Sequence, residues 1–227
     1  MEPAEIQSLP VRSRLDGIAE SLAHNRILML HAETGAGKTT LVPWRLLSHP
    51  SFAGSKILLL QPRRIAARAA ADRIAYLLNE RPGQTVGLRT RTETIIGKST
   101  RLEVITEGIL TRIIQNDQAL EGYGTVIFDE FHERTLQSDL ALALIWDSRE
   151  TIRPDMRILF MSATLPARDI HVAFGNMDLV SVPGRTHPVR TIYRPPLANE
   201  KPWEGAARLS AEATETIDSS AGGDVLV

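Results

Sequence analysis

Six short, mainly apolar runs stand out in this sequence, and several of them are apolar at every position rather than at every second one. They occupy residues 27–30, 57–60, 102–105, 126–128, 158–161 and 179–182. Strands buried on both faces of a parallel sheet have this composition, whereas a strand with one solvated face alternates apolar and polar residues. The runs therefore predict the strands of a central, mainly parallel sheet.

Segments with a helical pattern separate these runs. They lie at 38–48, 65–79, 107–116, 138–149 and, with a weaker pattern, 166–174. A strand followed by a helix, repeated in this way, predicts a doubly wound α/β sheet with helices on both faces. We assign this lobe to residues 1–195.

The end of the chain has a different pattern. An extended segment follows Pro183 and Gly184, and after it come a helical stretch at 203–217 and an apolar strand at 224–227. A Gly-Gly turn introduces that strand. We expect 196–227 to be a linker, a helix and the first strand of a truncated second α/β lobe. Because that strand lacks its sheet, we expect the tail to be poorly ordered or docked in a non-native way.

Composition excludes several classes of protein. The sequence has no cysteine, and its six histidines lack the H-x-x-H spacing of metal sites, so we expect no structural metal. The N-terminus has no signal-peptide pattern, and no apolar run reaches the roughly 20 residues that span a bilayer. We expect a cytoplasmic, monomeric chain without membrane contact.

The net charge of −1 hides a segregation of charge along the chain. Residues 61–101 contain nine basic and three acidic side chains, and residues 115–155 contain three basic and nine acidic ones. One part of the lobe can therefore hold phosphates although the whole is nearly neutral.

The stretch AETGAGKTT, residues 32–40, lies between a predicted strand and a predicted helix. It matches the phosphate-binding pattern G-x-x-x-x-G-K-[ST], with Ala32 in place of the first glycine. Lys38 would reach the β- and γ-phosphates of a nucleotide, and the Thr39 hydroxyl would bind Mg²⁺. Ala32 is tolerated because this position ends the strand, while the close approach to phosphate falls on Gly35 and Gly37. The alternative is a glycine-rich turn with a surface lysine.

Two acidic residues follow the predicted strand at 126–128. Asp129 and Glu130 stand at its carboxyl end, where ligands bind in open α/β sheets. Asp129 would hold Mg²⁺ through water, and Glu130 would act as the base for the attacking water, so that both contribute to the metal site. A solvated acidic turn is the alternative.

Together with AETGAGKTT, the D-E-x-H box at 129–132 resembles superfamily 2 helicases of the DEAH type, in particular their bacterial HrpB-like branch. The resemblance extends over nearly the whole chain and implies a RecA-like P-loop NTPase lobe of a helicase that uses ATP, other NTPs and Mg²⁺. QPRRIAAR, TEGIL and S-A-T, which begin at Gln61, Thr106 and Ser162, resemble further motifs in the family's order. Glu107 departs from the family's Asp.

The resemblance implies roles for individual residues. Nucleotide contacts fall on Glu33, Thr34, Gly35, Ala36, Gly37, Lys38, Thr39 and Thr40. Single-stranded RNA or DNA contacts fall on Arg63, Arg64, Arg91 and Thr106, and coupling of hydrolysis to strand separation on His132, Ser162 and Thr164. Arg73 would lie against the nucleotide base, which predicts weak discrimination between ATP and GTP. Ordinary helix starts, caps and surface arginines are the alternative readings of these positions.

One family motif is absent. The arginine-containing Q-x-x-G-R-x-G-R motif of the second RecA-like lobe does not occur in this sequence. We therefore expect nucleotide binding, very slow hydrolysis and no unwinding. A small-molecule kinase is disfavoured by the D-E-x-H box, and an ABC-type ATPase by the lack of an L-S-G-G-Q signature. A nucleotide-gated nucleic-acid-binding module without turnover remains the open alternative.

Overall fold

A computed structural model of the chain describes residues 4–164, 177–184, 193, 195, 197 and 200–216. By its internal contacts the chain divides into two compact units, Met1–Arg185 and Thr186–Val227. The first unit contains the sheet and the motifs, and the second contains one described helix. Each unit is considered by itself.

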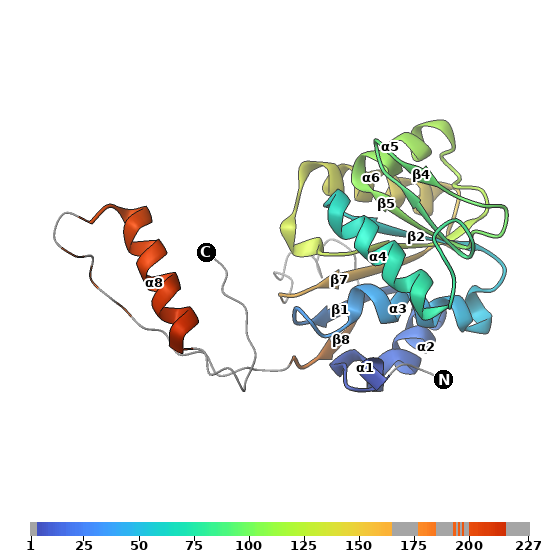
Figure 1. Cartoon of the computed structure of the whole chain (residues 1–227). Helices are drawn as coiled ribbons and strands as arrows, with labels where there is room; N and C mark the ends of the chain where they lie inside the picture. The colour runs from blue at the N-terminus through green and yellow to red at the C-terminus, as the bar shows by residue number, and fades with distance from the viewer. Residues whose placement is uncertain are drawn as a thin grey trace. The chain divides into compact units, whose positions relative to one another are not determined.

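The first unit is built on an eight-stranded sheet with the order β4-β3-β5-β2-β6-β7-β1-β8 (Figure 1). Every neighbouring pair is parallel except β3 and β4. The strands are β1 Ile27–Ala32, β2 Lys56–Gln61, β3 Val86–Arg89, β4 Thr94–Ile95, β5 Leu102–Thr106, β6 Tyr123–Phe128, β7 Arg157–Ser162 and β8 Asp178–Val182. The six predicted strands are thus confirmed as members of one mainly parallel sheet.

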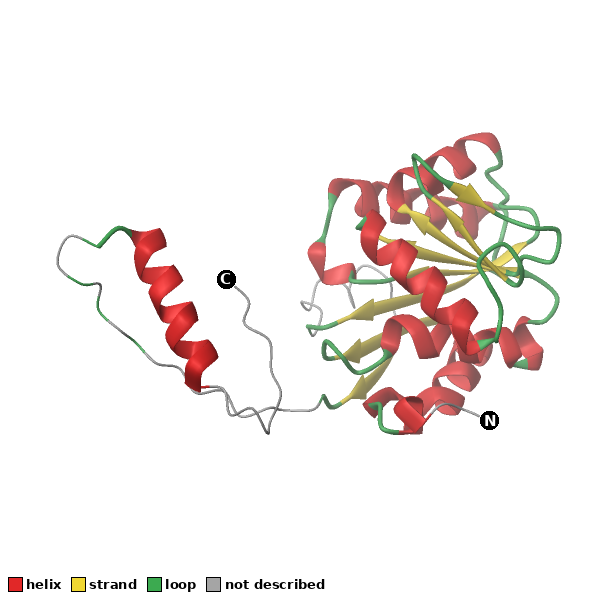
Figure 2. Ribbon diagram, in the orientation of Figure 1, coloured by secondary structure: helices red, strands yellow, loops and turns green. Residues whose placement is uncertain are grey.

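Helices pack on both faces of this sheet, and Figure 2 shows the strands between them. The helices of the first unit are α1 Ala4–Gln7, α2 Leu15–Asn25, α3 Lys38–Ser48, α4 Arg64–Leu77, α5 Glu107–Asn116 and α6 Leu136–Thr151, with 3-10 turns η1 Pro10–Arg14, η2 Pro50–Phe52 and η3 Phe131–Glu133. Apolar side chains of α2, α3 and α4 share one core, and those of α5 and α6 share a second one. The doubly wound α/β fold predicted from the sequence is therefore confirmed.

Alternate residues of the inner strands enter opposite cores, as β1 shows. Leu28 and Leu30 of β1 belong to the core beneath α2, α3 and α4, whereas Met29 belongs to the core beneath α5 and α6. All three side chains are fully buried. Two-sided burial therefore explains why the inner strands carry continuous apolar runs, whereas β8 at the edge of the sheet is largely exposed.

The register aligns the carboxyl ends of five strands along one edge of the sheet. Gln61 of β2 pairs with Thr106 of β5, and Leu60 pairs with Phe128 of β6. His31 of β1 pairs with Ser162 of β7. The motifs that follow these strands therefore share one edge, as their positions in the sequence predict.

Several elements were not predicted from the sequence. Helix α2 has apolar residues at Leu15, Ile18, Ala19 and Leu22, which is a helical spacing, but no capping bond from a described side chain marks its start. Strand β3 is only four residues long and contains Gly87. The two-residue strand β4 is antiparallel to it, so the sheet has a short mixed edge.

The described part of the second unit is helix α8, Pro202–Thr216. It lies within a residue of the predicted helix at 203–217. The Arg208 guanidinium bonds to Glu200 Oε1 and Oε2 at 2.8 and 3.0 Å. The predicted helix at 166–174 and the predicted strand at 224–227 lie outside the described residues, and the assignment of 196–227 to a second lobe stays a prediction. Among the described helices, none is both long and apolar enough to cross a membrane.

Candidate nucleotide-binding site

The loop between β1 and α3 places the N-terminus of α3 at the carboxyl edge of the sheet without a side-chain cap from the described residues. Strand β1 ends at Ala32, whose side chain is buried, so the small residue at this position fits the fold. Gly37 is the N-cap of α3, and none of the described side chains caps the helix. The first N–H groups of a helix have no intrahelical partner, and this uncapped end can therefore bind an anion.

Both glycines of the loop have left-handed backbones, but their surroundings differ. Gly35 has φ of 80° and no described atom near the position of a Cβ, whereas Gly37 has φ of 89° and a Cβ there would lie 2.9 Å from Leu9 Cδ1. Val11 N–H also donates to the Ala36 carbonyl at 3.1 Å. The segment before α2 therefore packs directly on the loop, a constraint that the motif itself does not contain.

Asp129 is the most deeply buried acid of the site, with 5% of its surface exposed. Its Oδ2 accepts hydrogen bonds from Thr39 Oγ1 and Gln61 Nε2, each at 2.5 Å, and its Oδ1 accepts from Glu130 N–H at 2.9 Å. Burial raises the pKa of the Asp129 carboxyl, and the Thr39 hydrogen bond opposes that shift. These contacts exclude the solvated acidic turn as an interpretation of Asp129.

Glu130 pairs with the lysine of the loop. Lys38, only 3% exposed, places its Nζ 3.1 Å from Glu130 Oε1. A buried ammonium needs such a partner, because its desolvation is otherwise unfavourable. Glu130 itself has a left-handed backbone, with φ of 50° and ψ of 38°, and this turn directs its side chain back toward the loop.

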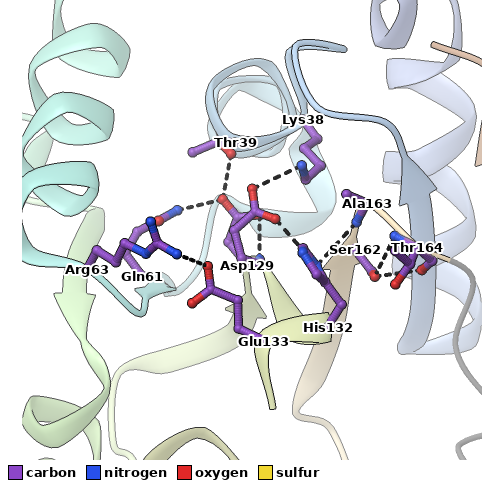
Figure 3. A network of polar contacts seen from close by, with 11 residues as sticks. Lys38, Thr39, Gln61, Arg63, Asp129, His132, Glu133, Ser162, Ala163 and Thr164 are labelled. Carbon is purple, nitrogen blue, oxygen red and sulfur yellow. Dashed lines mark hydrogen bonds and ion pairs between the residues drawn. The ribbon is translucent and has the colours of Figure 1, made fainter. Parts of the chain in front are cut away.

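His132 links the acidic pair to the segment that follows β7, as Figure 3 shows. Its Nδ1 lies 3.5 Å from Glu130 Oε2 and 3.5 Å from the Ala163 nitrogen. A single nitrogen can donate to the carboxylate or accept from the amide, but not both. Ser162 Oγ donates to the Thr164 carbonyl at 2.6 Å and accepts from Thr164 N–H at 3.2 Å. Of the three residues predicted to couple, His132 therefore lies beside Glu130, whereas Ser162 and Thr164 flank Ala163, whose nitrogen contacts His132.

The arrangement suits a magnesium nucleotide. Hydroxyl and carboxylate oxygens are the protein ligands that Mg²⁺ prefers. Thr39 supplies a hydroxyl and Asp129 a carboxylate, and the two groups are hydrogen-bonded to each other. Lys38 and the uncapped start of α3 supply positive charge for phosphate. Lys38, Thr39, Asp129 and Glu130 thus form one cluster, and their contacts with a nucleotide and Mg²⁺ stay predictions.

The residues predicted to contact nucleic acid lie at or just after the carboxyl ends of β2, β3 and β5. Arg63 is the N-cap of α4 with a side chain 72% exposed, and its Nη2 lies 3.0 Å from Glu133 Oε1. Arg64 and Arg91 are exposed. Thr106 is the N-cap residue of α5, yet its side chain makes no capping bond to that described helix. Capping therefore does not explain the Thr106 hydroxyl.

Sequence reasoning did not identify four contacts of the site. Gln61 is buried at the end of β2 and holds Asp129, a role that its place beside β6 at the shared edge could have indicated. Glu133 pairs with Arg63, and Thr135 Oγ1 donates to Glu107 Oε2 at 2.7 Å. The Arg73 guanidinium lies 5.3 Å from the Tyr76 ring within α4. The predicted contact of Arg73 with a nucleotide base stays a prediction.

Comparisons with known proteins agree with this geometry. The family model described as DEAD/DEAH box helicase matches residues 16–172. The chain is 47% identical to the ATP-dependent RNA helicase HrpB of Escherichia coli over 207 residues, which are 91% of the chain and 26% of that protein. A human putative ATP-dependent RNA helicase, DHX57, is 38% identical over 193 residues, which are 83% of the chain and 14% of that protein.

The fold matches as well. A crystal structure of the Escherichia coli DEAH/RHA helicase HrpB aligns with a TM-score of 0.87 and 46% identity over 93% of the chain and 27% of that structure. The chain thus spans about a quarter of the length of HrpB. Sequence, fold and the clustered P-loop and D-E-x-H residues lead to one assignment: the chain belongs to the DEAD/DEAH box helicase family.

Proposed function

We propose that this chain is the ATP-binding lobe of an RNA helicase that couples NTP hydrolysis to translocation along nucleic acid or to its unwinding. The observation that carries the proposal is the convergence of Lys38 and Thr39 from α3 with Asp129 and Glu130 after β6. The names of the Escherichia coli and human relatives, both ATP-dependent RNA helicases, support RNA as the substrate.

The contacts of each residue indicate its part in the proposed reaction. Thr39 and Asp129 would hold Mg²⁺, which supplies positive charge against the phosphates when it is bound. Lys38 is paired with Glu130 at 3.1 Å, so a phosphate group that reaches Lys38 competes with that ion pair. Nucleotide binding would thereby release the Glu130 carboxylate, which can then accept a proton from the attacking water.

Complete turnover requires groups that this sequence does not contain. The arginine motif of a second RecA-like lobe stabilises charge on the transferred phosphate in such enzymes, and it is absent here. We therefore expect the chain to bind ATP and GTP comparably, to hydrolyse them slowly and not to unwind RNA. In the complete protein we expect the second RecA-like lobe to be its partner.

A nucleotide-gated binding module is the second candidate. The exposed Arg63, Arg64 and Arg91 favour it, because they can bind a phosphate backbone whether or not hydrolysis follows. The two candidates differ only in turnover. Glu130 distinguishes them, since binding does not require a base.

The test uses a fluorescent ATP analogue for affinity and single-turnover hydrolysis of labelled ATP with the chain in excess. Lys38→Ala should abolish measurable nucleotide binding. Glu130→Gln should retain binding and reduce hydrolysis about 10²- to 10⁴-fold, the usual contribution of a general base. Hydrolysis by the Glu130→Gln variant at the rate of the parent chain would exclude the proposed base and favour the binding module.

A further inference from the structure

The five-residue segment Glu130–Arg134 joins the nucleotide site to the surface predicted to bind nucleic acid. It begins and ends with left-handed residues, Glu130 with φ of 50° and Arg134 with φ of 46°. Such conformations are unfavourable for residues with a Cβ, so contacts around the segment must hold it in this shape.

Contacts on opposite sides do so. On one side Lys38 pairs with Glu130. On the other, Arg63 pairs with Glu133, and Thr135, directly after the segment, donates to Glu107 (Figure 3 draws the Glu133 pair). Arg63 belongs to the QPRR segment, and Glu107 follows Thr106 of TEGIL. Glu130, the proposed general base, and the residues predicted to contact nucleic-acid phosphates are thus connected through one short turn that contains two left-handed residues.

The chemistry of the Arg63 contact is informative. Arg63 and Arg64 stand at the start of α4, where the helix dipole disfavours cations, so this position favours an anionic partner. Glu133 supplies a carboxylate there at 3.0 Å. A carboxylate and a phosphate bind a guanidinium through the same kind of charge-assisted hydrogen bond.

We propose that Glu133 is an internal competitor for nucleic-acid phosphate at Arg63 and a positioning residue for Glu130. A phosphate that binds Arg63 displaces Glu133 and removes one of the contacts that hold the segment Glu130–Arg134. Nucleic-acid occupancy thereby changes how firmly Glu130 is held beside Lys38. This inference rests on the proposed function, because it requires Arg63 to bind a nucleic-acid backbone.

The experiment is a double-mutant cycle on RNA affinity. Binding of a fluorescein-labelled single-stranded oligouridylate is measured by anisotropy for the parent chain, Glu133→Gln, Arg63→Gln and the double variant. Exposed ion pairs contribute up to about 1 kcal/mol, so Glu133→Gln should tighten RNA binding about twofold to fivefold. Arg63→Gln should weaken binding. In the Arg63→Gln background the Glu133→Gln gain should disappear, because the competitor then has no target.

A second measurement tests the link to the nucleotide site. The change in RNA affinity on adding a Mg²⁺-bound, non-hydrolysable ATP analogue should be smaller for Glu133→Gln than for the parent chain. Asp16→Asn is the charge-matched control, because Asp16 pairs with Arg45 rather than with Arg63 or a residue of the segment Glu130–Arg134. It should reproduce neither effect.

The outcomes separate the two proposals. If the parent chain binds no RNA at low salt, the proposed function fails and this inference fails with it. If the parent binds RNA but the Glu133→Gln gain is absent, or persists in the Arg63→Gln background, general charge explains the result and only this inference is overturned.

Discussion

Replacing Gly37 by alanine tests the contact between the loop and the segment that precedes α2. The change has two consequences that can be treated separately. Gly37 has φ of 89°, and an L-residue in this left-handed region costs about 1–2 kcal/mol. A Cβ would also lie 2.9 Å from Leu9 Cδ1, 3.3 Å from Leu9 Cβ and 3.4 Å from Val11 Cγ1, and overpacking of this kind costs about 1–3 kcal/mol.

The sum predicts a loss of about 2–5 kcal/mol in the free energy of unfolding for Gly37→Ala. Gly35→Ala is the matched control. Gly35 has φ of 80°, and no atom of the described residues lies within 4 Å of its Cβ position. It should therefore lose only the backbone contribution, about 1–2 kcal/mol. Urea unfolding of the nucleotide-free chain measures both losses on one scale.

Leu9 provides a further check. If overlap with Leu9 causes the extra loss, Leu9→Ala should recover part of it in the Gly37→Ala background, although Leu9→Ala alone should destabilise the chain because Leu9 packs against the core. Equal losses for Gly35→Ala and Gly37→Ala would refute the steric argument. A purely additive double variant would show that Leu9 is not the residue that clashes.

Three other substitutions test the energetics of the fold and the site. Glu103 is fully buried beside Lys56 and Arg89, at 3.1 and 3.3 Å, and Glu103→Ala should lower the free energy of unfolding by about 2–4 kcal/mol in urea, since it leaves two cations unpaired. Burial raises the pKa of the Asp129 carboxyl in the folded chain, so the folded chain loses stability as pH rises through that pKa and the carboxyl ionises. Asp129→Asn should therefore stabilise the nucleotide-free chain at neutral pH. The advantage should vanish in acid, as thermal melts across pH would show. Thr135→Ala should lose about 1–2 kcal/mol by removing the α6 cap to Ser138, whereas Thr135→Ser should lose little.

Strand positions were predictable because two-sided burial acts on every residue of a strand. Residues 57–60 are apolar throughout, and β2 contains them all. Helix α2 has an equally readable spacing at Leu15, Ile18 and Leu22, but its start gave no boundary signal. Strand β3 is too short for its periodicity to be distinguished from a loop. Local pattern therefore identified the interior of the sheet better than its edge.

The site divides in the same way. Lys38, Thr39, Asp129 and Glu130 could be named because each lies close to a strand whose end is visible in the sequence. The pair of Arg63 with Glu133 joins residues 70 positions apart. Neither residue has a local feature that requires the other, so only the tertiary fold, which brings the residues after β6 near those after β2, places them together. Contacts of this kind were not available to sequence reasoning.

The site concentrates groups that are each unfavourable alone. Lys38 is a buried ammonium, Asp129 is a buried carboxylate, and Glu130 has a left-handed backbone. Each buried charge is compensated by another group: Lys38 by Glu130, and Asp129 by Thr39 and Gln61. A bound phosphate and cation would replace these partners with equivalent charges, so the nucleotide-free contacts keep the groups in place without occupying the site permanently. Compensation within the chain thus explains how so polar a cluster persists at the edge of an apolar sheet and still remains exchangeable.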